Sequence, residues 1–369
     1  MAANPLLHLR EIGQSVWLDY IQRGLIENGG LERLIREDGL AGVTSNPAIF
    51  EKAITSGREY EAPIRELARR RLPAAALYET LTLEDIGRTA DLFRPLYERT
   101  QGGDGFVSIE VSPHLARDTS ATIAEAQRLW AALGRPNVMI KVPATRAGLP
   151  AIRALVAAGV NINVTLLFSV ARYREVAEAW MAGLEDRARA GAPLGRVASV
   201  ASFFLSRIDT LVDERLDKLG TGEARALRGL TAVASARLAY QAYKRIGAET
   251  RWQALARQGA RTQRLLWAST GTKDPANSDV MYVEPLIGRE TVNTLTPETL
   301  AAYRGHGDPA ARIEDGIEAA RALPLALHTL GIDLDEVTRQ LEEEGIRKFV
   351  EPYDKLLATL EQRRREAVG

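Results

Sequence analysis

Cysteine is absent from the 369-residue sequence. This absence excludes disulfides, thiolate metal sites and a cysteine nucleophile, and it is compatible with a reducing compartment such as the cytoplasm. Histidine is scarce as well: His8, His114, His306 and His328 lie far apart, and no two of them form an H-x-x-x-H pair. Because histidine-based metal sites commonly use such pairs, we expect no bound metal.

A net charge of either sign is also lacking, because 48 lysines and arginines balance 48 aspartates and glutamates. The overall charge therefore gives no reason to expect nucleic acid or an anionic membrane as a partner. No run of about 18 or more apolar residues is present to span a bilayer. The N-terminal stretch MAANPLLHLREIG lacks the long apolar core of a signal peptide. We expect a soluble, cytoplasmic protein with no nucleic-acid or membrane partner.

Short runs rich in β-branched residues alternate with amphipathic stretches along the chain. This alternation is typical of βα units that build a parallel sheet. No Gly-rich phosphate loop follows any of the runs, which argues against a dinucleotide-binding sheet and its cofactor. Eight strands with helices between them predict an α/β fold that closes into a (β/α)8 TIM barrel. The expected strands are 14–19, 41–46, 105–111, 137–142, 160–166, 196–202 and 263–269, with a weaker eighth at 290–296.

The organisation of the chain predicts a barrel over residues 1–308, with helical insertions near 57–101 and 222–258. Among the other expected helices is one at 23–36. A helical C-terminal extension, 309–369, is expected to pack on the same domain after a joint at the Gly-Asp-Pro of 307–309. Charge runs in this extension, such as EEEG at 342–345, indicate a solvated helix face. The extension could cover the barrel or contribute to a homo-oligomer interface, and the sequence leaves this open.

The expected strands end in polar side chains that share one face. Side chains alternate along a strand with period two, and the all-aliphatic face must pack against the outer helices. The opposite face then points into the barrel, near the C-terminal strand ends at which TIM barrels place catalysis. This phase places five residues inside: Asp19, Glu110, Lys141, Asn163 and Thr165. Asn46, Ser202 and Ser269 end three further strands in the same phase.

Lys141 is the centre of this set. A free lysine has a pKa of about 10.4, and burial favours the neutral amine, which can attack a carbonyl to form an imine. Such chemistry also requires groups that move protons, a role that suits the carboxylates of Asp19 and Glu110. From these residues alone, a structural ion pair of Lys141 with either carboxylate explains the pattern equally well.

Six motifs resemble the transaldolase family, and they occur in the family's order. They are WLDY at 17–20, GVTSNPAIFEKAI at 42–54, FVSIEVSP at 106–113, VMIKVPAT at 138–145, INVTLLFS at 162–169 and ASFFLSRID at 201–209. LLWASTGTKDPANSDVMYVEPLIG at 265–288 resembles the longer bacterial branch of the family. The resemblance implies a cofactor-independent transferase of the pentose phosphate pathway. Such an enzyme moves a dihydroxyacetone unit from sedoheptulose 7-phosphate or fructose 6-phosphate to an aldose phosphate.

The resemblance also implies a role for each catalytic residue. Lys141 would form a Schiff base with the keto carbon of the donor. Asp19 would exchange the proton of the C4 hydroxyl, while Glu110 and Thr165 would hold the water that shuttles protons.

Seven further residues would bind the substrate or line its pocket. Asn46 and Asn163 would hold hydroxyls of the dihydroxyacetone unit, and Arg207 would bind the phosphate. Lys273 stands where shorter members of the family carry an arginine as second phosphate ligand. The remaining residues expected to line the pocket are Ser202, Phe204 and Ser269.

Two alternatives remain at this stage. One is a fructose 6-phosphate aldolase, which releases free dihydroxyacetone and whose members tend to carry a tyrosine at the position of Phe204. The apolar ring of Phe204 favours transfer over cleavage. The other alternative is a catalytically inactive barrel used for binding, against which the complete set of Asp19, Glu110, Lys141 and Thr165 argues.

Overall fold

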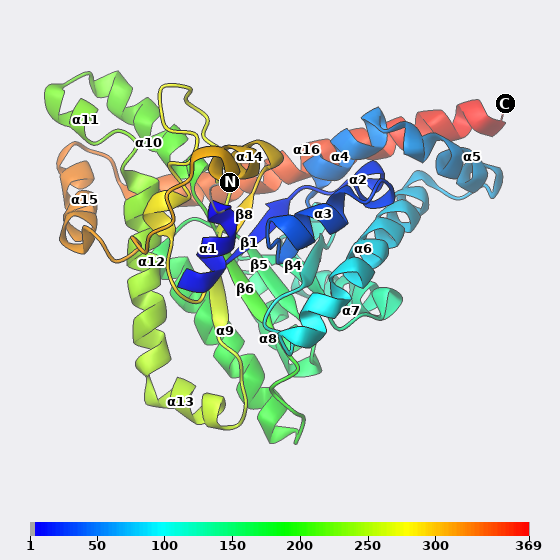
Figure 1. Ribbon diagram of the computed structural model, residues 1–369, viewed down its shortest axis with the longest axis horizontal. Coiled ribbons are helices and arrows are strands. Elements are labelled where there is room, and N and C mark those ends of the chain that lie inside the picture. Colours follow the sequence, from blue (N-terminus) through cyan, green and yellow to red (C-terminus); the bar gives the residue numbers. More distant parts are fainter. Residues whose placement is uncertain (1–3, 369) are drawn as a thin grey trace.

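Eight parallel strands form a closed barrel in the computed structural model, which describes residues 4–368 (Figure 1). Each strand pairs with the next one in the sequence, and the last strand pairs with the first. The predicted (β/α)8 TIM barrel is therefore confirmed, and so is its weaker eighth strand. The strands are β1 (Gln14–Asp19), β2 (Gly42–Thr44), β3 (Phe106–Glu110), β4 (Val138–Pro143), β5 (Ile162–Leu167), β6 (Ser199–Phe204), β7 (Gln263–Ala268) and β8 (Thr291–Leu295).

The strands are buried on both faces, as is usual for a parallel sheet covered by helices. β2 is shorter than the run expected at 41–46, and β5 and β6 both begin and end later than expected. Gly42 illustrates the tight interior, because a Cβ there would lie 2.6 Å from the Trp17 ring and 2.7 Å from the carbonyl oxygen of Phe106. Only glycine lets β2 pass beside the inward-facing Trp17.

In the first half of the barrel, capping residues, proline and glycine set where helices begin and end. Asn46 accepts a hydrogen bond from the N–H of Ile49 at 3.0 Å, and Pro47 follows as the first residue of the helix. The helix expected at 23–36 is two helices, because Gly29 adopts a left-handed φ of +70° that interrupts it. The helices here are α1 (Pro5–Ile12), α2 (Arg23–Glu27), α3 (Gly30–Glu37), α4 (Pro47–Ser56), η1 (Arg58–Tyr60), α5 (Glu61–Arg69), α6 (Ala74–Arg99), η2 (Pro113–Leu115), α7 (Thr119–Leu133) and α8 (Gly148–Ala158).

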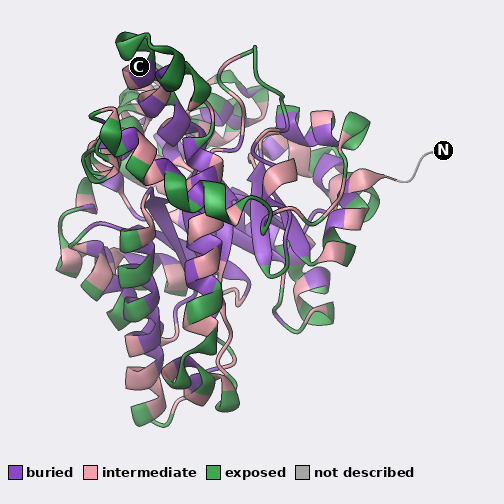
Figure 2. Cartoon of the chain, turned by 90° about the vertical axis from the view of Figure 1, so that its left-hand side faces the viewer, coloured by how far each residue is buried: buried purple, intermediate pink, exposed green. Residues whose placement is uncertain are grey.

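The second half of the chain is also mainly helical, and both predicted insertions form helices. The segment 57–101 forms η1, α5 and α6, and the segment 222–258 forms three helices before β7. Figure 2 shows the strands buried at the centre and the outer sides of the helices exposed. No helix within residues 4–368 is long and apolar enough to cross a membrane. The helices are α9 (Val170–Arg189), α10 (Ser206–Leu219), α11 (Gly222–Ala226), α12 (Thr231–Ala248), α13 (Thr250–Arg257), η3 (Glu284–Leu286), α14 (Pro297–His306), α15 (Ile317–Thr329) and α16 (Leu334–Val368).

The long helix α16 runs across one end of the molecule (Figure 1). It packs against α4, α5, α6, α10 and β5, and so it reaches elements from opposite sides of the barrel. The prediction that the EEEG run faces solvent is wrong for Glu342, whose partly buried carboxylate lies 3.5 Å from the guanidinium of Arg172. The extension thus covers the barrel, while the division of the chain at 307–309 stays a prediction.

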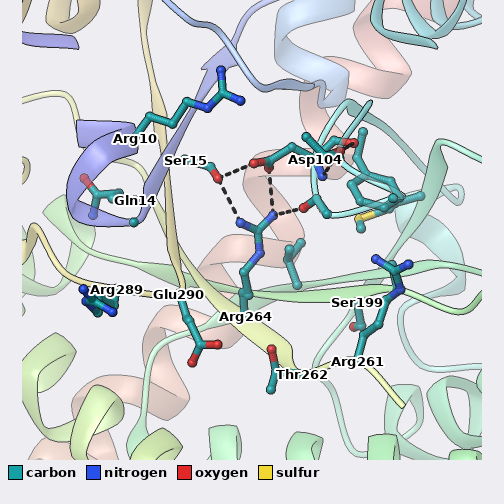
Figure 3. A pocket seen from close by; sticks show the side chains of 18 of the residues that line it. Arg10, Gln14, Ser15, Asp104, Ser199, Arg261, Thr262, Arg264, Arg289 and Glu290 are labelled. Carbon is teal, nitrogen blue, oxygen red and sulfur yellow. Dashed lines mark hydrogen bonds and ion pairs between the residues drawn. The ribbon is translucent and has the colours of Figure 1, made fainter. Parts of the chain in front are cut away.

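The opposite, N-terminal mouth of the barrel is held by an ion pair and its hydrogen bonds (Figure 3). Arg264 in β7 donates to Asp104 Oδ1 and to Ser15 Oγ, both at 2.9 Å. Ser15 in β1 donates in turn to Asp104 Oδ2 at 2.7 Å. These bonds join β1 and β7 to the loop before β3, beside a cavity of about 670 Å³. The N-terminal end of a TIM barrel serves stability rather than catalysis, which suits such a network.

Replacement of Asp104 tests this network. Asp104→Ala removes the acceptor of both Arg264 and Ser15 and leaves a mostly buried guanidinium without its carboxylate. We expect the free energy of unfolding to fall by about 2 kcal/mol, measured by urea denaturation. Asp91→Ala removes the exposed ion pair with Arg135 and should cost less than about 1 kcal/mol. Equal losses in the two variants would contradict the structural role given to Asp104.

Candidate active site

The C-terminal mouth of the barrel holds a cavity of about 70 Å³. It lies where the strand ends converge, at the position that TIM barrels use for catalysis. Glu110 contacts Lys141 from the neighbouring strand, Asn163 is fully buried beside the cavity, and Lys273 lies outside it. Eight of the side chains expected in the site line this cavity together: Asp19, Asn46, Lys141, Thr165, Ser202, Phe204, Arg207 and Ser269.

Lys141 reaches the cavity from the end of β4, and its side chain is only 5% exposed. Its Nζ atom donates to the carbonyl oxygen of Ser45 at 2.8 Å and lies 3.0 Å from Glu110 Oε1. The pair forms because Glu110 and Lys141 are direct neighbours in the register of β3 and β4. The amine is therefore fixed inside the barrel, with one carbonyl and one carboxylate beside it.

Burial raises the pKa of both carboxyl groups of the site, Glu110 and Asp19. Desolvation raises the pKa of Glu110, and the nearby charge of Lys141 opposes that rise. Desolvation likewise raises the pKa of Asp19, against the charge of Lys141 and a 2.7 Å hydrogen bond from Thr44 Oγ1. A carboxyl group whose pKa is raised toward neutrality is suited to exchange protons with a substrate hydroxyl.

Asn163 and Ser202 form a hydrogen-bonded pair across β5 and β6. Ser202 Oγ donates to Asn163 Oδ1 at 2.6 Å, and Asn163 Nδ2 donates to Ser108 Oγ at 3.1 Å. The amide expected to bind a substrate hydroxyl thus has protein partners at both of its ends. In this arrangement Asn163 positions Ser202, which itself lines the cavity.

Thr165 is almost fully buried, and its hydroxyl has no hydrogen-bond partner among the described residues. Buried hydroxyls are normally paired, so an unpaired one at a cavity marks a place for a polar partner. The next residue, Leu166, has a φ of +61°, and the pairing of β5 with β6 shifts there. This irregularity lies directly behind the residue whose hydroxyl faces the cavity.

Arg207, the second residue of α10, places its guanidinium near two aromatic rings. Its Cζ atom lies 5.3 Å from the ring centre of Phe204 and 5.8 Å from that of Phe349. Burial lowers the pKa of this guanidinium, and the charges of Glu110 and Asp19 oppose the shift. Its buried Nη1 atom has no hydrogen-bond partner among the described residues, so the group is available to an anion.

Ser269 and Lys273 follow β7. Ser269 lines the cavity with a left-handed φ of +55°, a strained value for serine, and its hydroxyl lies 2.8 Å from that of Ser206. Lys273 is exposed in the loop that leads to η3. Burial raises the pKa of Asp19, and the charge of Lys273 is a minor influence that opposes this rise from outside the cavity.

Five residues that line the cavity were missed in the sequence, the apolar Leu266 and Ala268 of β7 and three others. Thr44 and Thr294 share a hydrogen bond of 2.7 Å between their hydroxyls and stand in the inward phase of β2 and β8. The same period-two argument that placed Lys141 could have found them. Phe349 comes from α16, and no local pattern distinguishes it from the other apolar residues of that helix.

Asp209 secures α10, the helix that carries Arg207. Its carboxylate accepts hydrogen bonds from the N–H of Ala232 at 2.7 Å and from the Tyr282 hydroxyl at 2.9 Å. These contacts attach the first turn of α10 to α12 and to the loop before β8. Burial raises the pKa of Asp209 to about 6.

A buried lysine that pairs with one carboxylate and shares its cavity with a second, at the C-terminal mouth of a (β/α)8 barrel, is the arrangement of a class of enzyme. Its members make and break carbon–carbon bonds through an imine of the lysine. A family model described as Transaldolase/Fructose-6-phosphate aldolase matches residues 16–360, and the chain belongs to this family. The transaldolase resemblance of the motifs is therefore confirmed, and with it the assignment to the transferases.

Relatives of similar length carry the same name. The chain is 49% identical over 372 residues to Transaldolase 2 of Nostoc sp., and the match covers 98% of each chain. It is 49% identical over 360 residues to the transaldolase of Thermobifida fusca, covering 97% of this chain and 98% of the relative. A third relative, Transaldolase 1 of Streptomyces coelicolor, is 49% identical over 97% of this chain and 94% of its own.

The raised pKa of Asp209 predicts a pH-dependent stability. A group whose pKa is higher in the folded state favours folding when protonated, so its contribution is lost as pH rises through about 6. Relative to Asp209→Asn, the wild type should lose about 3 kcal/mol of unfolding free energy between roughly pH 3 and pH 8. Urea denaturation at several pH values measures this difference. Asp315→Asn, at an exposed position, is the control, and an identical pH profile for both variants would refute the prediction.

Proposed function

We propose that the chain transfers a dihydroxyacetone unit through a Schiff base on Lys141. The donor is sedoheptulose 7-phosphate or fructose 6-phosphate, and the acceptor is an aldose phosphate of the pentose phosphate pathway. The observation that carries the proposal is the buried Nζ atom of Lys141, which lies 3.0 Å from Glu110 and lines one cavity together with Asp19. A catalytically inactive barrel would gain nothing from two buried carboxylates in the region of this amine, because burying charged groups costs stability.

The first half of the reaction follows from these positions. The amine of Lys141 attacks the C2 carbonyl of the donor, and one water leaves as the iminium forms. Glu110 and the unpaired hydroxyl of Thr165 hold the water that carries protons in this step. Asp19 then takes the C4 hydroxyl proton, the C3–C4 bond breaks, and its electrons move into the iminium to give an enamine.

The second half reverses these steps with another aldehyde. The aldose phosphate formed from the donor leaves, and an acceptor aldehyde takes its place. The enamine carbon attacks the aldehyde, Asp19 returns the proton to the new hydroxyl, and water releases the product from Lys141. A side chain that serves in both directions must titrate near the working pH, which the raised pKa of Asp19 favours.

The remaining polar groups bind the substrate. Asn46 uses its carbonyl oxygen to cap α4, so its amide nitrogen is left to donate to a substrate hydroxyl. Ser202 and Ser269 line the same cavity, and Asn163 acts by orienting Ser202. Arg207 binds the phosphate with its free Nη1 atom, and Lys273 serves as a second, more distant positive charge.

Transfer, rather than simple cleavage, is supported by the apolar ring of Phe204 in the cavity. Phe204 packs on Phe168 with ring centres 5.4 Å apart and presents no hydroxyl to the cavity. Phe204 therefore adds no hydroxyl that could position a further water against the enamine, beyond the water assigned to Glu110 and Thr165. A cytoplasmic location, the absence of a cofactor and a homo-oligomeric assembly stay predictions from the sequence.

Trapping the intermediate tests the role of Lys141. Borohydride with fructose 6-phosphate should attach a three-carbon unit to Lys141 in the wild type, located by peptide mass spectrometry. Lys141→Ala should form no adduct and should lose sedoheptulose 7-phosphate formation in a coupled assay with erythrose 4-phosphate. Lys52→Ala, in α4 and outside the cavity, is the control for loss of a lysine. An adduct that persists in Lys141→Ala would end the assignment.

Replacement of Asp19 separates imine formation from bond cleavage. Asp19→Ala should still give the borohydride adduct of the intact donor, because the amine and Glu110 remain in place. Loss of the proton acceptor should lower kcat by about 10²- to 10⁴-fold. Rapid-quench measurement of glyceraldehyde 3-phosphate release gives the cleavage rate. If the variant fails to form the imine at all, Asp19 has a structural role instead.

A further inference from the structure

Phe349 is brought to the active site by a helix outside the eight βα units. Its side chain lies in the middle of α16 and is only 6% exposed. The ring centre is 5.7 Å from Lys141 Nζ and 5.8 Å from Arg207 Cζ. The other described residues that line the cavity come from the strands or from the segments directly after them.

The place of this ring is set by a close approach of helix and barrel. A Cβ at Gly345 would lie 2.9 Å from Leu166 Cδ2, so the backbone of α16 passes directly over the end of β5. Residues four apart lie on the same face of a helix. Phe349 therefore faces the barrel one turn after Gly345, beside Thr165 and Lys141.

The helix is attached to the rim on both sides of this contact. Before it, Glu336 lies 3.2 Å from Arg215 of α10. After it, Lys355 lies 2.7 Å from Glu51 of α4, and Arg363 donates to the carbonyl oxygens of Ile54 and Thr55. These attachments hold the ring in place although the rest of the cavity is built by the barrel.

The space left beneath the ring is small. The cavity of about 70 Å³ has room for about two water molecules, whereas pockets for small molecules usually measure about 300 Å³ or more. The cavity is lined by polar side chains, among them Thr165, Asp19 and Ser202, and by the apolar ring of Phe349.

We propose that Phe349 is a specificity-determining residue that keeps water from the three-carbon enamine on Lys141. The inference rests on the proposed function. After C3–C4 cleavage the enamine has two fates. It can attack an acceptor aldehyde, or its carbon can take a proton to give the iminium. In the second case one water adds at C2, the C–N bond breaks, and free dihydroxyacetone leaves the neutral amine of Lys141.

The ring favours the first fate for two reasons. It offers no donor or acceptor that could hold a water near the amine, and it occupies the volume from which bulk water would approach. Like Phe204, it lies within about 6 Å of Arg207 Cζ, so it helps to steady the guanidinium proposed to bind the acceptor's phosphate. The preference for transfer over cleavage therefore depends on α16, through Phe349, as well as on the barrel.

The test measures both fates in one reaction. Fructose 6-phosphate is the donor and erythrose 4-phosphate the acceptor, and free dihydroxyacetone is measured beside sedoheptulose 7-phosphate. Phe349→Ala opens the site, and Phe349→Tyr adds a hydroxyl with little change of shape. Both should raise the ratio of dihydroxyacetone to sedoheptulose 7-phosphate by about tenfold. Phe349→Leu keeps an apolar cover and should stay near the wild-type ratio.

A matched control separates the ring from the attachment of its helix. Leu356→Ala removes a fully buried side chain from α16 two turns after Phe349, outside the cavity. It should lower stability without changing the product ratio. An unchanged ratio in Phe349→Tyr, or an equal rise in Leu356→Ala, would overturn the inference. Borohydride trapping on every variant keeps the two proposals apart, because a wild type without an adduct refutes the Schiff base itself.

Discussion

The ion pair of Lys141 and Glu110 lies inside a closed ring of strands, where both side chains are less than a tenth exposed. Removing two charges from water is costly, and their attraction offsets the cost only when the geometry is exact enough to keep them together. The register of β3 and β4 supplies that geometry, because the two residues are direct neighbours. An apolar pair of similar size would serve stability equally well, so the ion pair is best explained by the chemistry of its amine.

Polar side chains form an ion-paired network at one mouth of the barrel and line the candidate active site at the other. At the N-terminal mouth, Arg264, Asp104 and Ser15 satisfy one another and join segments that are distant in the chain. At the C-terminal mouth, the Thr165 hydroxyl and Arg207 Nη1 are buried without a partner among the described residues. Both residues line one cavity, and buried polar groups left unpaired at a cavity are characteristic of a binding site.

Much of the barrel could be predicted because the alternation of strand side chains is a local property. The period-two pattern placed Lys141, Asp19 and Thr165 correctly inside, and it would also have identified Thr294. It could not show that the side-chain amide of Asn163 is hydrogen-bonded at both its oxygen and its nitrogen. The partners, Ser202 and Ser108, lie on other strands, and which residues meet there depends on the register of the sheet. Nor could it show that Lys273 stands outside the cavity, because a loop has no periodicity from which its course can be read.

The sequence by itself determined the order of strands and helices, the side of each strand that faces inward and the family to which the chain belongs. Each of these follows from residues that are close to one another in the sequence, or from short motifs that occur in a fixed order along it. Tertiary structure alone decided that Gly345 lets α16 pass over β5 and that Phe349 covers Lys141. Such contacts join residues far apart in the chain, and they arise from packing between surfaces whose shape exists only after the barrel has closed.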